Sequence, residues 1–300
     1  MSKQVHQIEL FDSPLTTAVK GETSLMEYPF FDLSKNGRAQ GMHFNDGKVK
    51  IDIKAANGSV ATIYDKDVLI YLASIMVGKI NNGETPSQTF TFTAHDYFRV
   101  TNRNRSARSY ERIASAIERL QGTQIKTNIE TGGEGVTGFF SWLEKAEINY
   151  TVDRSGKKVM RSITVRVCDF IYRAVLMDRR FLTYHPAYFD LSPLERRVYE
   201  IARKHCGRQE GFKISLDKLH KKTGSDASLK SFKRSLYDLI EADNVPEYMI
   251  GIVGDDRSAL TKSLKADGIV PRNKITATKD QMVVIMPRGA KRTARLCAIT

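Results

Sequence analysis

The sequence predicts an α+β protein with two tandem winged helix-turn-helix domains related by internal duplication. Two observations carry this prediction. A pattern of three helices followed by strands occurs twice along the 300 residues, and the third helix of each copy is rich in basic side chains. Matching positions in the two copies, such as Thr93 and Ser215, lie 122 residues apart. A repeated order of elements at one spacing indicates a duplicated unit.

The first copy opens with a predicted helix at 65–79, in which apolar residues recur at helical spacing. A short strand at 90–93 follows, and Thr93 with Asp96 forms a capping-box pattern that starts a second helix. A third helix is expected at 106–121, where an Asn- and Arg-rich turn precedes it and a glycine ends it.

Alternating sequences after this third helix predict two hairpins. The first joins 123–130 to 136–142 through a glycine-rich turn, and the second joins 146–152 to 159–167 around a Ser-Gly turn. Three helices backed by a hairpin describe a winged helix-turn-helix, whose third helix enters the major groove of DNA.

The second copy begins at Ser192, where a cap residue, a proline and Glu195 at the third position indicate a helix start. The other elements expected in this copy are a strand at 212–214, helices at 215–224 and 228–242, and paired strands at 248–253 and 282–286. A long basic loop joins the last two strands. This order repeats that of the first copy.

Charge and periodicity divide the chain into parts. Its beginning lacks sustained periodicity and carries a net charge of −2, which predicts a flexible tail. The expected parts are an N-terminal tail at 1–30, a first winged-helix domain at 31–168, a second at 169–287, and a basic C-terminal tail at 288–300.

The composition, with 41% apolar and 27% charged residues, excludes a disordered or fibrous chain. The longest apolar stretch has ten residues, about half of what a membrane-spanning helix needs, and we expect no membrane partner and no secretory signal. Three scattered cysteines indicate a soluble protein of a reducing compartment, the cytoplasm. The net charge of +13 favours binding to a polyanion.

The basic residues gather in blocks that coincide with the two third helices. Residues 101–126 carry a net charge of +4 and residues 202–234 carry +7, while residues 257–300 add +8. Arginine can bond both major-groove acceptors of guanine or grip phosphate, and lysine mainly supplies phosphate affinity. The predicted DNA-binding residues are Arg103, Arg105, Arg108, Ser109, Arg112 and Arg119 in the first copy, and Lys221, Lys222, Lys230, Lys233 and Arg234 in the second.

An ordinary solvated helix face is the competing interpretation of these residues. It predicts interspersed acidic residues for i,i+4 pairing, and Glu111 and Glu118 fit it on the first helix. The second helix has no acidic residue between Ser228 and Tyr237. Basic helices at matching places in both copies therefore favour contact with duplex DNA.

The sequence predicts no catalytic residue, metal site or cofactor, and hence a protein that is not an enzyme. The motif at 133–138 spells a dinucleotide fingerprint but leads into a strand instead of a helix. The six histidines are isolated, and no phosphate-binding loop is present. We interpret Asp65 and Asp67 as a helix-start feature favoured by the helix dipole, and the aromatic run at 139–142 as hairpin packing.

Some segments have a distinctive order of residues in addition to their hydrophobic periodicity. They are Phe31-Asp32-Leu33-Ser34-Lys35-Asn36, His43-Phe44-Asn45-Asp46-Gly47, Arg103–Leu120, and Phe181–Gly207 with its Leu191-Ser192-Pro193-Leu194-Glu195-Arg196-Arg197. Over residues 28–250 the chain resembles the bacterial plasmid replication initiator A proteins. The resemblance implies tandem winged helices similar in plan to iteron-binding Rep proteins.

The same resemblance implies a function. Such a protein binds repeated double-stranded sites in a plasmid origin, helps to open nearby A·T-rich DNA, and recruits the host initiator and the replicative helicase. It also implies repression of its own promoter, often as a homodimer.

Other functions stay open from the sequence alone. A winged-helix transcriptional repressor without an initiation role shares the architecture. A strand-nicking replication enzyme is disfavoured because it needs a pair of metal-binding histidines, which is absent. An RNA-binding protein is disfavoured because no aromatic-rich sheet is visible.

Overall fold

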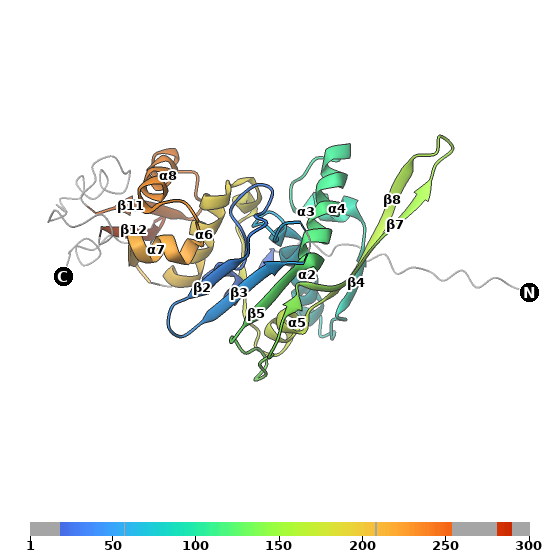
Figure 1. The fold of residues 1–300 in the computed structure, drawn as a ribbon, viewed down its shortest axis with the longest axis horizontal. Coiled ribbons are helices and arrows are strands. Elements are labelled where there is room, and N and C mark those ends of the chain that lie inside the picture. The colour runs from blue at the N-terminus through green and yellow to red at the C-terminus, as the bar shows by residue number, and fades with distance from the viewer. Residues whose placement is uncertain (1–18, 57, 208, 254–280, 290–300) are drawn as a thin grey trace, which may run out of the picture.

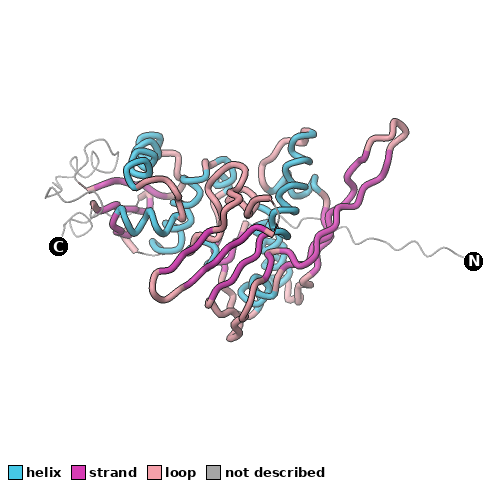
Figure 2. The backbone as a smooth tube through the Cα atoms, in the orientation of Figure 1, coloured by secondary structure: helices cyan, strands magenta, loops and turns pink. Residues whose placement is uncertain are grey.

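Two modules follow one another along the molecule in a computed structural model that describes residues 19–56, 58–207, 209–253 and 281–289. Figure 1 shows the second module, with α6, α7 and α8, beside the first, from which a long hairpin extends. The backbone trace shows helices and strands mixed in both modules (Figure 2). Within the described residues, no helix is long and apolar enough to span a membrane.

The first module has the predicted order of elements. They are α2 (Lys66–Asn81), β4 (Thr89–Phe92), α3 (Ala94–Val100), α4 (Ala107–Gly122), β7 (Leu143–Val152) and β8 (Lys158–Val167). Its three strands form an antiparallel sheet in the order β4-β8-β7. The β7–β8 hairpin is the long arm of Figure 1.

The second module repeats this plan. Its elements are α6 (Pro193–Cys206), β10 (Phe212–Ser215), α7 (Leu216–Thr223), α8 (Leu229–Ala242), β11 (Tyr248–Ile252) and β12 (Met282–Pro287). The sheet order β10-β12-β11 is the same as β4-β8-β7 in the first module. In both, the strand before the second helix pairs with the last strand of the hairpin. The predicted fold of two tandem winged helices is therefore confirmed.

Local sequence signals set the helix starts. The Thr93 hydroxyl accepts a hydrogen bond from the Asp96 amide, and the Ser215 hydroxyl accepts one from the Lys218 amide. Ser192 and Glu195 form a complete capping box with proline in the first turn of α6. These side chains satisfy amides that have no partner inside the helix. The predicted starts are confirmed.

The first module contains a second sheet. It has the order β2-β3-β5-β6, formed by β2 (Met42–Asn45), β3 (Lys50–Ala55), β5 (Thr123–Thr127) and β6 (Phe140–Ser141). The expected hairpin between 123–130 and 136–142 is present as the short β5–β6 pair, in which Ile125 lies opposite Phe140. The β2–β3 hairpin had no sequence prediction.

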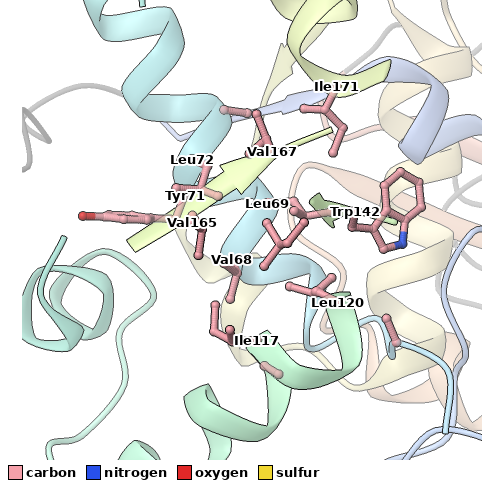
Figure 3. Packing of buried hydrophobic residues seen from close by; sticks show 14 of the residues in the cluster. Val68, Leu69, Tyr71, Leu72, Ile117, Leu120, Trp142, Val165, Val167 and Ile171 are labelled. Carbon is pink, nitrogen blue, oxygen red and sulfur yellow. The ribbon is translucent and has the colours of Figure 1, made fainter. Parts of the chain in front are cut away.

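Each module has its own hydrophobic core. In the first, Val68, Leu69 and Leu72 of α2 pack against α4 and β8 (Figure 3). Trp142 is fully buried and stacks on Phe31, with 5.2 Å between the ring centroids. The second core gathers side chains from α6, α7, α8 and the β10-β12-β11 sheet.

The expected flexible tail at 1–30 is wrong for residues 19–30. There, β1 (Lys20–Glu22) pairs with β9 (Phe181–Thr183), and α1 (Thr23–Glu27) follows it. Leu25 of α1 joins the first core, whereas Met26 joins the second. The segment is too short for a periodic pattern, but distant parts of the chain bury its apolar side chains. Residues 1–18 lie outside the described residues.

The expected domain boundary at 168/169 is also wrong. Helix α5 (Asp169–Leu176) follows β8 and buries Phe170, Ile171 and Val175 in the first core. After α5, the first fully buried residue of the second core is Tyr184, shortly before a 3-10 helix, η1 (Pro186–Asp190). Of the expected C-terminal tail, residues 290–300 lie outside the described residues, as does most of the basic loop after β11.

Candidate nucleic-acid interface

Helix α4 has one face in the core and one in solvent. Ile113, Ile117 and Leu120 are buried in the first core. Arg105, in the turn before the helix, and Arg108 and Arg112 on it are all exposed. The Ser106 hydroxyl caps the helix, and its first turn has no acidic residue. The exposed basic side chains therefore lie beside the positive end of the helix, where anions are favoured.

Helix α8 has the same arrangement. Phe232, Leu236, Leu239 and Ile240 are buried in the second core. On the other side, Lys230 and Arg234 are exposed, and Lys233 is half-buried with its ammonium 5.7 Å from the centre of the Tyr237 ring. Ser228 caps the helix, and the first turn again has no acidic residue. Each module thus presents a basic third helix to solvent.

Two predicted DNA-binding residues of α4 point into the protein instead. Ser109 is buried, and its hydroxyl donates a hydrogen bond to Asn104 Oδ1 at 2.7 Å. Arg119 forms a bidentate pair with Asp65, with 2.7 Å from Nε to Oδ2 and from Nη2 to Oδ1. Both side chains bind other parts of the chain, and we do not assign them to DNA.

Arg103 precedes α4 and also binds within the protein. Its Nη2 lies 3.4 Å from Asp67 Oδ2 and 3.1 Å from the carbonyl of Phe189, a residue of the second module. The guanidinium therefore joins the two modules, and we do not count it as a groove contact.

The lysines at the end of α7 differ from each other. Lys221 is exposed and pairs with Asp217 one turn earlier, at 2.8 Å. Lys222 turns toward α1, with its ammonium 3.5 Å from the Glu27 carboxylate and 5.4 Å from the centre of the Tyr28 ring. Of these two lysines, only Lys221 is exposed and available to a ligand from solvent.

The tip of the β7–β8 hairpin is a further basic surface, which was not predicted from the sequence. Arg154, Lys157 and Lys158 are exposed there. Asp153 holds the turn, since its carboxylate accepts hydrogen bonds from the Ser155 hydroxyl and from the amides of Lys157 and Ser155, and these bonds, that of the hydroxyl above all, lower its pKa. A run of basic residues in a Ser-Gly turn was the available signal. Basic side chains at the end of such an arm can reach phosphates beyond the groove.

Residues 20–250 match the family model described as replication initiator protein A. The chain belongs to the replication initiator protein A family. A relative from Wigglesworthia glossinidia brevipalpis, named as a replication protein, is 36% identical over 259 residues, which cover 83% of this chain and 90% of the relative. This confirms the family that the sequence resembles.

Two solved structures share the initiator's fold. Both are crystal structures of domains 2 and 3 of RctB, with TM-scores of 0.59 and 0.52. The first is 13% identical and covers 88% of this chain and 97% of the other, and the second is 14% identical and covers 86% and 94%. At this identity the likeness shows that the arrangement of both modules recurs.

The initiator's two modules meet at the start of α2. Asp65, Lys66 and Asp67 are all buried. The sequence pattern predicted a helix-start role for the two acids, but each accepts hydrogen bonds from arginine side chains. A pair of acids before an apolar helix is compatible both with a helix start and with buried ion pairs, so no sequence signal distinguished these two roles.

Lys66 lies at the centre of this junction. Its ammonium is 2.6 Å from Glu200 Oε1 of α6 and donates to the carbonyl of Leu25 at 2.8 Å. Burial lowers the pKa of Lys66 to about 8, against the opposing effect of the Glu200 carboxylate. Such buried charges are tolerated because each has charged and polar partners.

Proposed function

We propose that this initiator binds repeated duplex sites in a plasmid origin, with α4 and α8 in consecutive major grooves roughly 10 bp apart. Arg105, Arg108 and Arg112 read or clamp one groove. Lys230, Lys233 and Arg234 occupy the other. The arginines supply more of the base reading and the lysines more of the phosphate affinity.

One observation supports this function above the others. The exposed basic faces of α4 and α8 occupy the same place in two modules of equal topology. A solvated surface explains basic residues in general, but it does not explain why both third helices carry them. The exposed hairpin tip at 153–158 adds phosphate contacts beside the first groove.

Binding by several copies opens the A·T-rich DNA nearby. The energy comes from bending DNA at flexible steps, and no nucleotide hydrolysis is needed. In this proposal the chain acts as a binding protein and not as an enzyme. Its partners are the host initiator and the replicative helicase, and as a cytoplasmic homodimer it represses its own promoter.

Footprinting on the plasmid's own DNA upstream of the coding sequence tests this function. We expect protected repeats, and we expect Arg108→Ala and Lys233→Ala each to weaken protection roughly tenfold or more. Removing a phosphate contact also reduces the slope of log affinity against log salt by about 0.9. Lys35→Ala, which removes an exposed lysine outside both third helices, is the matched control. Absence of protection would rule out origin binding.

A further inference from the structure

We propose that the buried charges between the modules fix the separation of α4 and α8, so that Asp67, Arg103 and Arg196 determine which spacing of half-sites the initiator binds. This inference rests on the proposed function, and it assigns these residues a positioning role. None of them touches DNA in this role. They act through the placement of the two third helices.

The first link joins α4 to the start of α2. Arg119, near the end of α4, pairs with Asp65 through two hydrogen bonds of 2.7 Å. Arg103, just before α4, reaches Asp67 at 3.4 Å. Both ends of α4 are therefore held by Asp65 and Asp67, two acids that lie two residues apart.

The second link joins α2 to α6 of the second module. Arg196 Nη1 lies 2.6 Å from Asp67 Oδ1, and neither side chain is more than 2% exposed. The other nitrogens of Arg196 donate to the carbonyls of Leu191 at 3.0 Å and Phe189 at 2.6 Å. Arg103 donates to the same Phe189 carbonyl, so one carboxylate and one carbonyl hold both arginines.

A parallel contact strengthens this second link. Glu200 accepts hydrogen bonds from Lys66 of the first module and from the hydroxyls of Tyr184 and Tyr188 of the second. Arg197 adds a contact of 3.1 Å to the same carboxylate. All the charged groups of this cluster are buried.

The third link extends from α6 to the helix before α8. Arg197 donates to the carbonyl of Met26 at 2.6 Å and to those of Glu27 at 2.8 Å and Lys222 at 2.9 Å. Lys222 is in the last turn of α7, which ends at Gly224 shortly before α8 begins. A series of buried and part-buried polar contacts thus runs from α4 through α2 and α6 to the end of α7. Helix α7 in turn packs on α8, where the ring centroids of His220 and Phe232 lie 4.7 Å apart.

Such a series resists displacement of one module against the other. Sliding or rotating α6 over α2 would separate buried charges from their partners, and an unpaired buried charge is costly. On B-form DNA, one additional base pair moves the second half-site by about 3.4 Å along the axis and about 35° around it. A rigid initiator therefore binds one spacing, and a loosened one tolerates several.

Selection from a pool of random 40-bp duplexes measures this directly. We expect the wild-type chain to enrich two motifs at one separation. Arg103→Gln and the double variant Asp67→Asn/Arg196→Gln are expected to enrich the same motifs at several separations. The preference for the original separation over one longer by two base pairs should fall roughly tenfold or more. Arg166→Gln, in a surface pair with Glu144, is the control.

The outcomes separate the two proposals. Folded variants that keep the single separation overturn the positioning role and leave the proposed function intact. A wild-type chain that enriches no pair of motifs overturns the proposed function. Arg103 is partly exposed, so Arg103→Gln keeps the test valid even if the double variant does not fold.

A measurement without DNA tests the rigidity itself. Spin labels on cysteines placed at Gln121 and Glu241, exposed positions near the ends of α4 and α8, report the distance between the helices. Cys297→Ser removes a competing thiol. We expect a narrow distance distribution that broadens in Asp67→Asn/Arg196→Gln. A broad wild-type distribution would overturn the inference.

Discussion

At the scale of single residues, Arg108 and Arg119 lie on the same helix but have different surroundings. Arg108 is exposed, whereas Arg119 forms a bidentate pair with a buried acid of α2. Helical spacing placed both on one side of α4. It did not show that the last turns of this side face the start of α2.

This difference predicts unequal losses of stability for two alanine substitutions. Arg119→Ala leaves Asp65 buried without its charged partner and should lower the free energy of unfolding by roughly 3 kcal/mol. Arg108→Ala removes an exposed side chain and should change it by less than about 0.5 kcal/mol. Urea unfolding followed by circular dichroism measures both. Equal stability of the two variants would show that the Arg119 pair contributes nothing.

The sequence identified candidate side chains by type and spacing, and this works where solvent surrounds the helix. Arg105, Arg108 and Arg112 are exposed as the pattern predicts. Arg103 and Ser109 fit the same pattern but bind within the protein. Which basic residues stay free for a ligand depends on segments distant in the sequence, and one chain's periodicity carries no information about them.

At the scale of elements, Gly224 shows how a helix end meets another part of the fold. It ends α7 in a left-handed conformation with φ of +72°, as a C-cap glycine does. A Cβ at this position would lie 2.6 Å from Cβ of Pro29. The sequence predicts the cap, but the close approach exists only because the segment after α1 packs there.

Gly224→Ala is therefore expected to lower the free energy of unfolding by more than backbone strain alone would. We compare it with Gly156→Ala, because Gly156 has φ of +82° and open space around it. Gly156→Ala should cost about 1 kcal/mol from backbone strain, and Gly224→Ala at least about 2 kcal/mol, since a clash with Pro29 adds to it. Thermal or urea unfolding measures the difference in stability between the two variants. A smaller loss at Gly224 than at Gly156 would contradict this packing.

His205 makes the contact between α6 and β10 sensitive to acid. Its ring stacks on Phe212 with 4.5 Å between centroids, and its Nε2 lies 3.9 Å from Glu27. Burial, together with the nearby Lys222 ammonium, lowers the pKa of His205 from 6.5 to about 4. Between these values the unfolded chain binds a proton that the folded chain does not. Stability from this residue is thus present above pH 6.5 and is lost as the pH falls toward 4.

His205→Gln should flatten that dependence. The amide does not titrate, so the free energy of unfolding should fall less between pH 6.5 and 4 than in the wild type. Urea unfolding at several pH values measures the two slopes. Parallel slopes for wild type and His205→Gln would refute this role.

At the scale of the whole molecule, parts of the chain that build the first module also contribute side chains to the second core. Ile70 of α2 and Met26 of α1 belong to the second core, although the chain around them builds the first. Strand β1, near the beginning of the first module's sequence, pairs with β9, which follows the last helix of that module. The second core is therefore incomplete without side chains from the first module's part of the chain.

We therefore expect both modules to unfold together. Scanning calorimetry should show one transition with equal calorimetric and van't Hoff enthalpies. Glu200→Ala removes the acceptor shared by Lys66, Tyr184 and Tyr188, and should lower the stability of the whole transition by roughly 3 kcal/mol. Two separate transitions in the wild-type chain would contradict a shared junction.

The sequence by itself determined the repeated order of elements, the helix starts and the basic third helices. These depend on local spacing, on capping chemistry and on residue type, all of which a linear pattern contains. The tertiary structure decided where the modules divide, how the N-terminal segment is buried, and that Asp65, Lys66 and Asp67 bind partners on α4 and α6. A buried charge needs a partner from elsewhere in the chain, and only the folded arrangement shows which residue provides it.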